Sequence, residues 1–85
     1  MRTLKKAIKN LKTQEQIEDF IKSLFTLNEI EELEKRLSII QMLLQGISQR
    51  EISRRLKVGI ATVSRGATEL KKDNFKFLKS QNDKK

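Results

Sequence analysis

Apolar residues recur every three or four positions in the first part of the chain, which is the spacing of amphipathic α-helices. Residues 1–12 form one such segment, with lysines on the opposite face. A second segment follows Thr13 and Gln16, a pair that predicts a capping box, in which each side chain bonds a backbone N–H at the start of a helix. Two short helices are therefore expected before residue 25. Their apolar faces hold Leu4, Ala7, Ile8, Leu11, Ile17, Phe20, Ile21 and Leu24.

A longer helix is predicted to begin at Thr26, which pairs with Glu29 as a second capping box. It runs to about Gln45, because Gly46 can take the left-handed conformation that ends many helices. Its second half is apolar around most of the circumference, at Leu37, Ile39, Ile40, Met42, Leu43 and Leu44. Such a helix is buried on nearly all sides, and a chain of 85 residues is too short to cover it. We therefore expect residues 1–45 to build a homodimer, and an intertwined one.

Two short helical patterns meet within residues 48–72, across a tight break at residues 57–59. Ser48 with Glu51 predicts the start of the first helix through a third capping box. Two helices that cross steeply over a short turn form a helix-turn-helix, whose second helix can lie in a DNA major groove. Short side chains on the outward face let the backbone approach base edges closely. They are Ala61, Thr62, Ser64 and Thr68.

A last short helix is predicted over residues 73–81, with Asp73 and Asn74 as its cap. Its apolar contacts are expected from Phe75, Phe77 and Leu78. Residues 80–85 are polar and are expected to fray. The chain has no proline and three glycines, so the sequence predicts an all-α fold in a single helical domain over residues 1–85.

The charge of the chain indicates a polyanionic partner. The formal net charge is +8 and the pI is about 10.1. Residues 13–36 hold seven acidic and three basic residues, so the positive excess lies at the N-terminus and in residues 50–72. Duplex DNA is the natural partner of a helix-turn-helix with such a surplus.

Several classes of function are disfavoured by what the sequence lacks. Cysteine and histidine are absent, so the usual nucleophile–base pairs, disulfides and zinc ligand sets are missing. We expect no enzyme, no metal site and no cofactor. No apolar run approaches the roughly 18 residues of a membrane span, and no signal peptide is recognisable, so we expect a cytoplasmic protein. The basic helix over residues 1–12 leaves three readings open: a membrane surface, DNA phosphates, or a solvated face over a dimer seam.

Two stretches of the sequence resemble the bacterial tryptophan repressor family. Residues 58–66 read Val-Gly-Ile-Ala-Thr-Val-Ser-Arg-Gly, and residues 48–51 read Ser-Gln-Arg-Glu. The similarity includes residues 26–46 and covers roughly residues 23–78, whereas residues 1–22 match only in being helical and amphipathic. The resemblance implies an all-α, intertwined dimer that represses transcription when L-tryptophan occupies two pockets.

The resemblance also implies a corepressor site. In the family the ligand's indole lies between two arginines, which here are Arg36 and Arg65, and planar guanidinium groups do stack on aromatic faces. Thr26 would bind the ligand carboxylate. The carbonyls of Ser23 and Phe25 would receive its ammonium group. By residue type alone, the two arginines are equally well explained as a surface cation and a phosphate contact.

Three further positions bear on that site and on the turn. Gly66 would leave room beside Arg65 for the ligand. Glu69 stands where the family has a serine, and its carboxylate either binds the ligand's ammonium group or pairs with Arg65, four residues earlier. Lys57 replaces a glycine of the family's turn, and a lysine in left-handed geometry costs about 1 kcal/mol.

The positions that match the family's DNA contacts are Gln49, Arg50, Ser53, Ile60, Ala61, Thr62, Ser64 and Lys71. Arg50 is the long donor able to grip a guanine with two hydrogen bonds, whereas Gln49 and Lys71 suit phosphates. Because most of the set is short, we expect readout through ordered water and DNA shape. A twofold dimer requires a palindromic operator, with recognition helices about 34 Å apart.

Three functions follow from the sequence as alternatives. The first is a repressor gated by L-tryptophan. The second is a constitutive helix-turn-helix protein that binds DNA without a small-molecule ligand. The third is a helical interaction protein that does not bind DNA, and the basic bias of residues 50–72 disfavours it.

Overall fold

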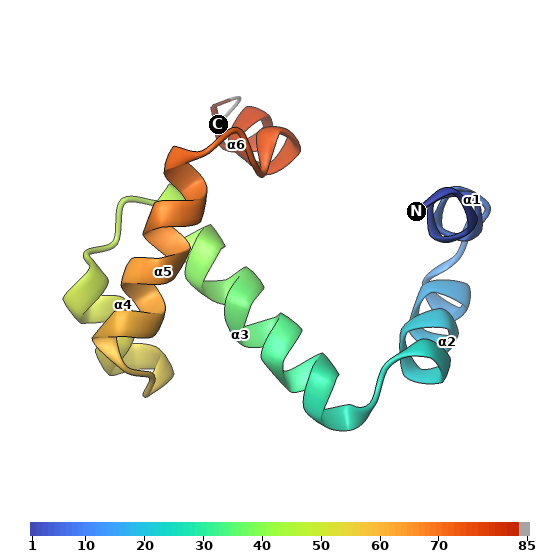
Figure 1. Ribbon diagram of the computed structural model, residues 1–85, viewed down its shortest axis with the longest axis horizontal. Coiled ribbons are helices and arrows are strands. Elements are labelled where there is room, and N and C mark those ends of the chain that lie inside the picture. The colour runs from blue at the N-terminus through green and yellow to red at the C-terminus, as the bar shows by residue number, and fades with distance from the viewer. Residues whose placement is uncertain (84–85) are drawn as a thin grey trace. The chain divides into compact units, whose positions relative to one another are not determined.

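The chain is all-helical, which confirms the predicted fold class. The computed structural model describes residues 1–83, and within them it contains six α-helices and no strand (Figure 1). The helices are α1 (Arg2–Lys9), α2 (Gln14–Leu24), α3 (Leu27–Leu44), α4 (Gln49–Leu56), α5 (Ile60–Lys71) and α6 (Lys76–Asp83). The chain divides into two compact units, Met1–Glu32 and Leu33–Lys85. The single domain over residues 1–85 stays a prediction.

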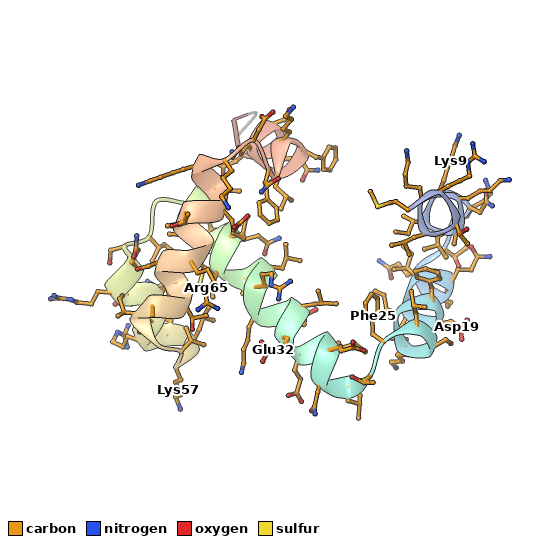
Figure 2. The ribbon with its side chains drawn as sticks, viewed as in Figure 1. Lys9, Asp19, Phe25, Glu32, Lys57 and Arg65 are labelled. Carbon is orange, nitrogen blue, oxygen red and sulfur yellow. The ribbon has the colours of Figure 1, made fainter. Side chains whose placement is uncertain are left out.

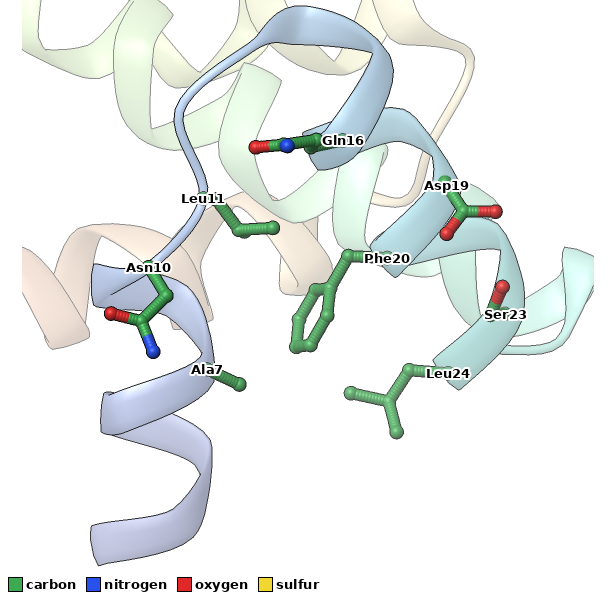
Figure 3. A pocket seen from close by; sticks show the side chains of 8 residues that line it. All are labelled: Ala7, Asn10, Leu11, Gln16, Asp19, Phe20, Ser23 and Leu24. Atoms are coloured by element: carbon green, nitrogen blue, oxygen red, sulfur yellow. The ribbon is translucent and has the colours of Figure 1, made fainter.

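The first unit contains α1, α2 and the start of α3. The predicted cap of α2 is confirmed, because Thr13 Oγ1 accepts a hydrogen bond from the Gln16 N–H at 3.1 Å and Gln16 Oε1 accepts from the Thr13 N–H at 3.3 Å. Neither α1 nor α2 has a buried residue. A hollow lies between the two helices, and Figure 3 shows Phe20 and Leu24 turned toward Ala7 and Leu11 across it. The apolar faces therefore meet without closing into a core.

Both ends of α3 follow the prediction. At its start, Thr26 Oγ1 accepts from the Glu29 N–H at 3.1 Å, and Glu29 Oε1 accepts from the Thr26 N–H at 2.9 Å. At its end Gly46 has φ +84°, and the Ile47 N–H donates to the Met42 carbonyl at 3.1 Å. This is the Schellman arrangement, in which a left-handed residue lets the chain satisfy the last carbonyls of the helix.

The core of the second unit lies where α3, α4 and α5 meet. Its buried residues are Ile39, Ile40, Ile52 and Val63. Gly66 lets α5 approach α3 closely: a Cβ atom at this position would lie 2.8 Å from the Cγ2 atom of Ile39, which is inside van der Waals contact. The backbone of α5 is thus packed directly on the face of α3 that carries the buried isoleucines.

The last helix differs from the prediction. It spans Lys76–Asp83 and not residues 73–81, because Phe75 adopts a left-handed conformation with φ 57°. Asp73 and Asn74 therefore do not cap it, and residues 80–83 are helical. Phe77 is 73% exposed and is not a core contact. The helix is held to α3 by Asn82, whose side-chain amide donates to the Leu44 carbonyl at 2.9 Å. The last two residues of the expected fraying end lie outside the described residues.

Candidate nucleic-acid interface

The turn between α4 and α5 is fixed by local hydrogen bonds. Lys57 has φ 56° and ψ 44°, so the expected left-handed lysine is present. The N–H groups of Lys57 and Val58 both donate to the Ser53 carbonyl. The Ser53 hydroxyl in turn donates to the Val58 carbonyl. Ser53, one of the expected DNA contacts, is half-buried and its hydroxyl proton is used inside the turn.

Two fully buried side chains pack α4 and α5 of the helix-turn-helix against each other. Ile52 on α4 and Val63 on α5 are both 0% exposed. Ile47 packs against the same cluster, as expected of a hydrophobic staple at the start of α4. The side of α5 opposite Val63 therefore faces away from the core. The expected contacts Ala61, Thr62 and Ser64 are exposed, and so is Ile60, which lies at the start of α5 one turn before Val63.

A hydrogen bond between side chains also joins the first turn of α4 to α5. The Ser64 hydroxyl donates to Gln49 Oε1 at 2.7 Å. Both residues belong to the predicted DNA contacts, and the structure brings them together across 15 positions of sequence. Ser64 also lies one turn before Thr68, whose hydroxyl donates to the Ser64 carbonyl at 3.1 Å.

The basic side chains of α4 divide into free and paired ones. Arg50 is exposed and forms no ion pair within residues 1–83. Arg54 and Arg55 both bond to Glu51, the second of them at 2.7 Å. The hydrogen bond from Arg54, with that from Arg55, lowers the pKa of Glu51 to about 2. Only half of the third capping box therefore forms, since the Ser48 hydroxyl accepts from the Glu51 N–H while the carboxylate binds the arginines.

The start of α5 presents backbone donors. Its N-cap is Gly59, which makes no side-chain capping bond. The first N–H groups of a helix have no intrahelical partner and attract anions. Ile60, the first residue of the helix, is 51% exposed. Lys71, the last, is exposed and forms no ion pair with the described residues. The start of α5 thus presents positive potential from its backbone, and Lys71 adds one positive side chain at the other end.

The two arginines expected at the corepressor site belong to the second unit. Arg36 on α3 and Arg65 on α5 are exposed, and neither forms an ion pair within residues 1–83 (Figure 2 shows Arg65 on α5). Arg36 lies one helical turn before Ile39, and Arg65 adjoins Gly66, so the close contact of Gly66 with Ile39 lies beside both arginines. Gly66 has this packing role as well as the expected one of leaving room for a ligand.

Glu69 does not pair with Arg65. Its carboxylate accepts from Lys72 Nζ and from Asn74 Nδ2, each at 3.0 Å. The hydrogen bond from Lys72 lowers the pKa of Glu69. The alternative in which Glu69 holds Arg65 away from a ligand is therefore wrong for this structure.

The other expected corepressor contacts lie in the first unit. Thr26 is the capping residue of α3, and its hydroxyl oxygen already accepts one hydrogen bond. Ser23 lies in the last turn of α2, where carbonyls lack intrahelical acceptor bonds. Phe25 follows that helix in extended conformation, with φ −111° and ψ 150°. Unpaired carbonyls of this kind suit an ammonium group.

The comparisons with known proteins agree on one family. The chain is 49% identical over 65 residues to the Trp operon repressor homolog of Vibrio cholerae serotype O1, which covers 75% of this chain and 63% of that protein. It is 44% identical over 78 residues to the Trp operon repressor homolog of Vibrio vulnificus strain YJ016. That match covers 91% of this chain and 71% of the relative. The model of the family described as "Trp repressor protein" matches residues 1–82. The chain belongs to the Trp repressor protein family.

Membership of this family confirms the resemblance seen in the sequence, and it extends the match to residues 1–22. The family is one of transcriptional regulators and not of enzymes. The match spans less than two thirds of the Vibrio cholerae relative's length. No solved structure matches the chain significantly.

Sequence reasoning missed two features of this Trp repressor family member. One is the Glu51 cluster, although the spacing of three and four residues from Glu51 to Arg54 and Arg55 signals it. The other is the bond between Ser64 and Gln49, which no local pattern signals. Among the described residues, no group of acidic side chains could hold a metal ion. No helix within residues 1–83 is long and apolar enough to cross a bilayer.

Proposed function

We propose that this chain is a transcriptional repressor that binds a palindromic operator as a homodimer, with L-tryptophan as its corepressor. The observation that carries the proposal is the outward face of α5, where short exposed side chains lie beside Gln49 of α4, which accepts a hydrogen bond from Ser64. The next residue of α4, Arg50, is exposed and forms no ion pair within residues 1–83. Buried Ile52 and Val63 hold that face at a fixed angle to α4. Two copies of such a helix, one turn of DNA apart, fit successive major grooves.

Exposed apolar side chains support the homodimer. Leu27 is 78% exposed, Leu37 41% and Leu33 38%, although all three lie on one helix. A 9.9 kDa chain that leaves this much apolar surface uncovered gains stability by burying it against a second copy. The intertwined arrangement expected from the sequence is part of the proposal.

The corepressor role rests on Arg36 and Arg65. Both guanidinium groups are exposed and unpaired within the described residues, so both are free to stack on an indole ring. Gating requires that the ligand bind better to one tilt of the reading helices than to others. The carbonyls of Ser23 and Phe25, with the Thr26 hydroxyl, would take the polar end of the amino acid. The Glu69 carboxylate is held by Lys72 and Asn74, so it would bind the ligand's ammonium group only by giving up one of these partners.

The test is operator binding measured with and without L-tryptophan. A palindromic site is selected from random duplexes, labelled, and titrated with protein by fluorescence anisotropy, with L-alanine as the control amino acid. Affinity that rises only with L-tryptophan supports the repressor, and calorimetry then gives the ligand's own affinity. Equal affinity in all three conditions identifies a constitutive DNA-binding protein. No binding even at low salt identifies a helical interaction protein. With DNA as its proposed partner, the protein would act in the cytoplasm.

A further inference from the structure

A second basic surface lies outside the helix-turn-helix. Helix α1 carries Arg2, Lys5, Lys6 and Lys9, which we call the α1 basic face. Their spacing of three and four residues places all four on one side of the helix. We infer that the α1 basic face binds phosphates of duplex DNA independently of base sequence. The inference rests on the proposed function and adds to it a second point of contact with the same DNA.

The α1 basic face is open to solvent. All four side chains are exposed. The other side of the helix is turned toward α2, where Ala7 and Leu11 line the hollow opposite Phe20 (Figure 3). Figure 2 shows Lys9 projecting from α1 away from α2. The charges therefore lie on the side of the first unit that α2 leaves free.

Among the described residues, no carboxylate forms an ion pair with these charges. Residues 1–14 contain five basic residues, the fifth being Lys12, and the first acidic residue is Glu15. By contrast, Lys22 on α2 pairs with Glu18 at 3.7 Å.

The stability of α1 does not explain the basic face. Like charges three or four residues apart repel each other and weaken a helix. Arg2 and Lys5 lie at the start of the helix, where the helix dipole favours acidic side chains, and the first turn has none. The N-cap Met1 supplies no side-chain bond that would compensate. An anion bound along this face would relieve the repulsion.

Duplex DNA fits the α1 basic face better than a lipid surface does. From Arg2 to Lys9 the helix rises about 10 Å, and a duplex carries one charge per about 1.7 Å of its axis, so several phosphates face that length. A helix that lies in a membrane needs a free apolar face with aromatic anchors. Helix α1 has no aromatic residue to anchor it in a bilayer. Its Ala7 lines the hollow beside α2, and its large apolar side chains Leu4 and Ile8 are 40% and 52% exposed.

The experiment measures the salt dependence of duplex binding. The test variant is Lys5→Gln/Lys6→Gln/Lys9→Gln, since glutamine keeps the helix propensity of lysine while removing the charge. The control is Lys22→Gln/Lys35→Gln/Lys76→Gln, which lowers the net charge equally, from +8 to +5, on other helices. Circular dichroism first establishes that both variants keep the helix content of the parent chain. Anisotropy titrations of one duplex then run from low to high KCl.

We expect the DNA affinity of the test variant, and not that of the control, to depend less steeply on salt concentration than that of the parent chain. Each phosphate contact contributes about 0.9 to the slope of log K against log salt, so three lost contacts make the slope shallower by about 2–3 per chain bound. The control should change the slope by less than about one. Equal slopes in the two variants would overturn the inference and leave the proposed function intact.

Two further outcomes separate this inference from its competitors. If the parent chain shows no operator preference but the slopes still differ, the proposed function fails and the α1 basic face stands as a phosphate-binding surface. Sedimentation with phosphatidylserine vesicles tests the lipid reading. Vesicle binding that is lost in the test variant, together with an unchanged DNA slope, would assign the face to a membrane and overturn the inference.

Discussion

Ser64 on α5 donates a hydrogen bond to Gln49 on α4 over 2.7 Å. The bond joins the first turn of one helix of the motif to the outward face of the other. It orients a glutamine amide at the edge of the proposed DNA-binding surface, and both groups remain close to solvent. Ser64 therefore lies at the centre of the proposed interface while the core of the motif is built by other residues.

Replacement of Ser64 should separate DNA binding from folding. In Ser64→Glu the new carboxylate faces the phosphates, so duplex affinity should fall by at least about tenfold, or about 1.4 kcal/mol. Thermal unfolding should change little, because the site is exposed. Ser80→Glu introduces the same charge on α6 and is the matched control. Unchanged DNA affinity of Ser64→Glu would remove α5 from the interface.

Gly66→Ala should destabilise the second unit although alanine is the better helix former. The new methyl group would lie 2.8 Å from Cγ2 of Ile39, a buried β-branched side chain with little freedom to move. Overpacking of this kind costs about 1–3 kcal/mol, against about 1 kcal/mol gained in helix propensity. Thr68→Ala, on an exposed position of α5, is the control and should stay within about 0.5 kcal/mol. Chemical denaturation gives both values.

A double-mutant cycle tests the cause. If Gly66 is required by Ile39, then Gly66→Ala in an Ile39→Ala background should cost less than it does alone. Additive effects would instead mean that the two positions do not contact each other.

The Glu51 cluster should stabilise the fold in a pH-dependent way. The pKa of Glu51 is lowered to about 2 from 4.5, so its contribution is complete above about pH 4.5 and is lost as the pH falls toward 2. The difference in melting temperature between the parent chain and Glu51→Gln should therefore be largest near neutrality and shrink at low pH. Glu31→Gln is the control for the loss of one negative charge. A difference that grows on acidification would have the wrong sign for this cluster.

Arg36→Ala should weaken the corepressor and leave nonspecific DNA binding nearly intact. A cation stacked on an indole is worth about 0.5–2 kcal/mol, so L-tryptophan affinity should fall about 2–30-fold in calorimetry. Lys35→Ala removes the same charge from the neighbouring position of α3 and should leave ligand affinity near that of the parent chain. If Arg36→Ala unfolds the protein, Arg36 has a structural role and its assignment to the pocket loses its support.

Short patterns predicted the starts of α2 and α3 and the end of α3, whereas α1 spans Arg2–Lys9 and not the expected residues 1–12. Thr13 with Gln16, and Thr26 with Glu29, form the reciprocal bonds expected of them, and Gly46 takes the left-handed conformation. These features involve residues within four positions of one another, so local chemistry determines them. The turn at Lys57 was predicted from the sequence for the same reason.

Some side chains had more than one possible hydrogen-bond partner, and the local sequence did not show which one they would bind. The Glu51 carboxylate had two possible uses, and the charged arginines prevailed over the Ser48 backbone N–H. Asp73 pairs with Lys76 at 3.0 Å, and the last helix begins three residues later than predicted. Each choice depends on which neighbour offers the stronger bond in the folded chain.

The sequence by itself determined the all-helical fold, the position of the helix-turn-helix and the residue types on its outward face, because helical periodicity and caps are short-range properties. Tertiary structure alone decided that Gly66 packs on Ile39, that Ser64 binds Gln49, and that Arg36 and Arg65 form no ion pair within the described part of the chain. Contacts between helices depend on how closely two backbones approach, and spacing along one chain does not encode that distance.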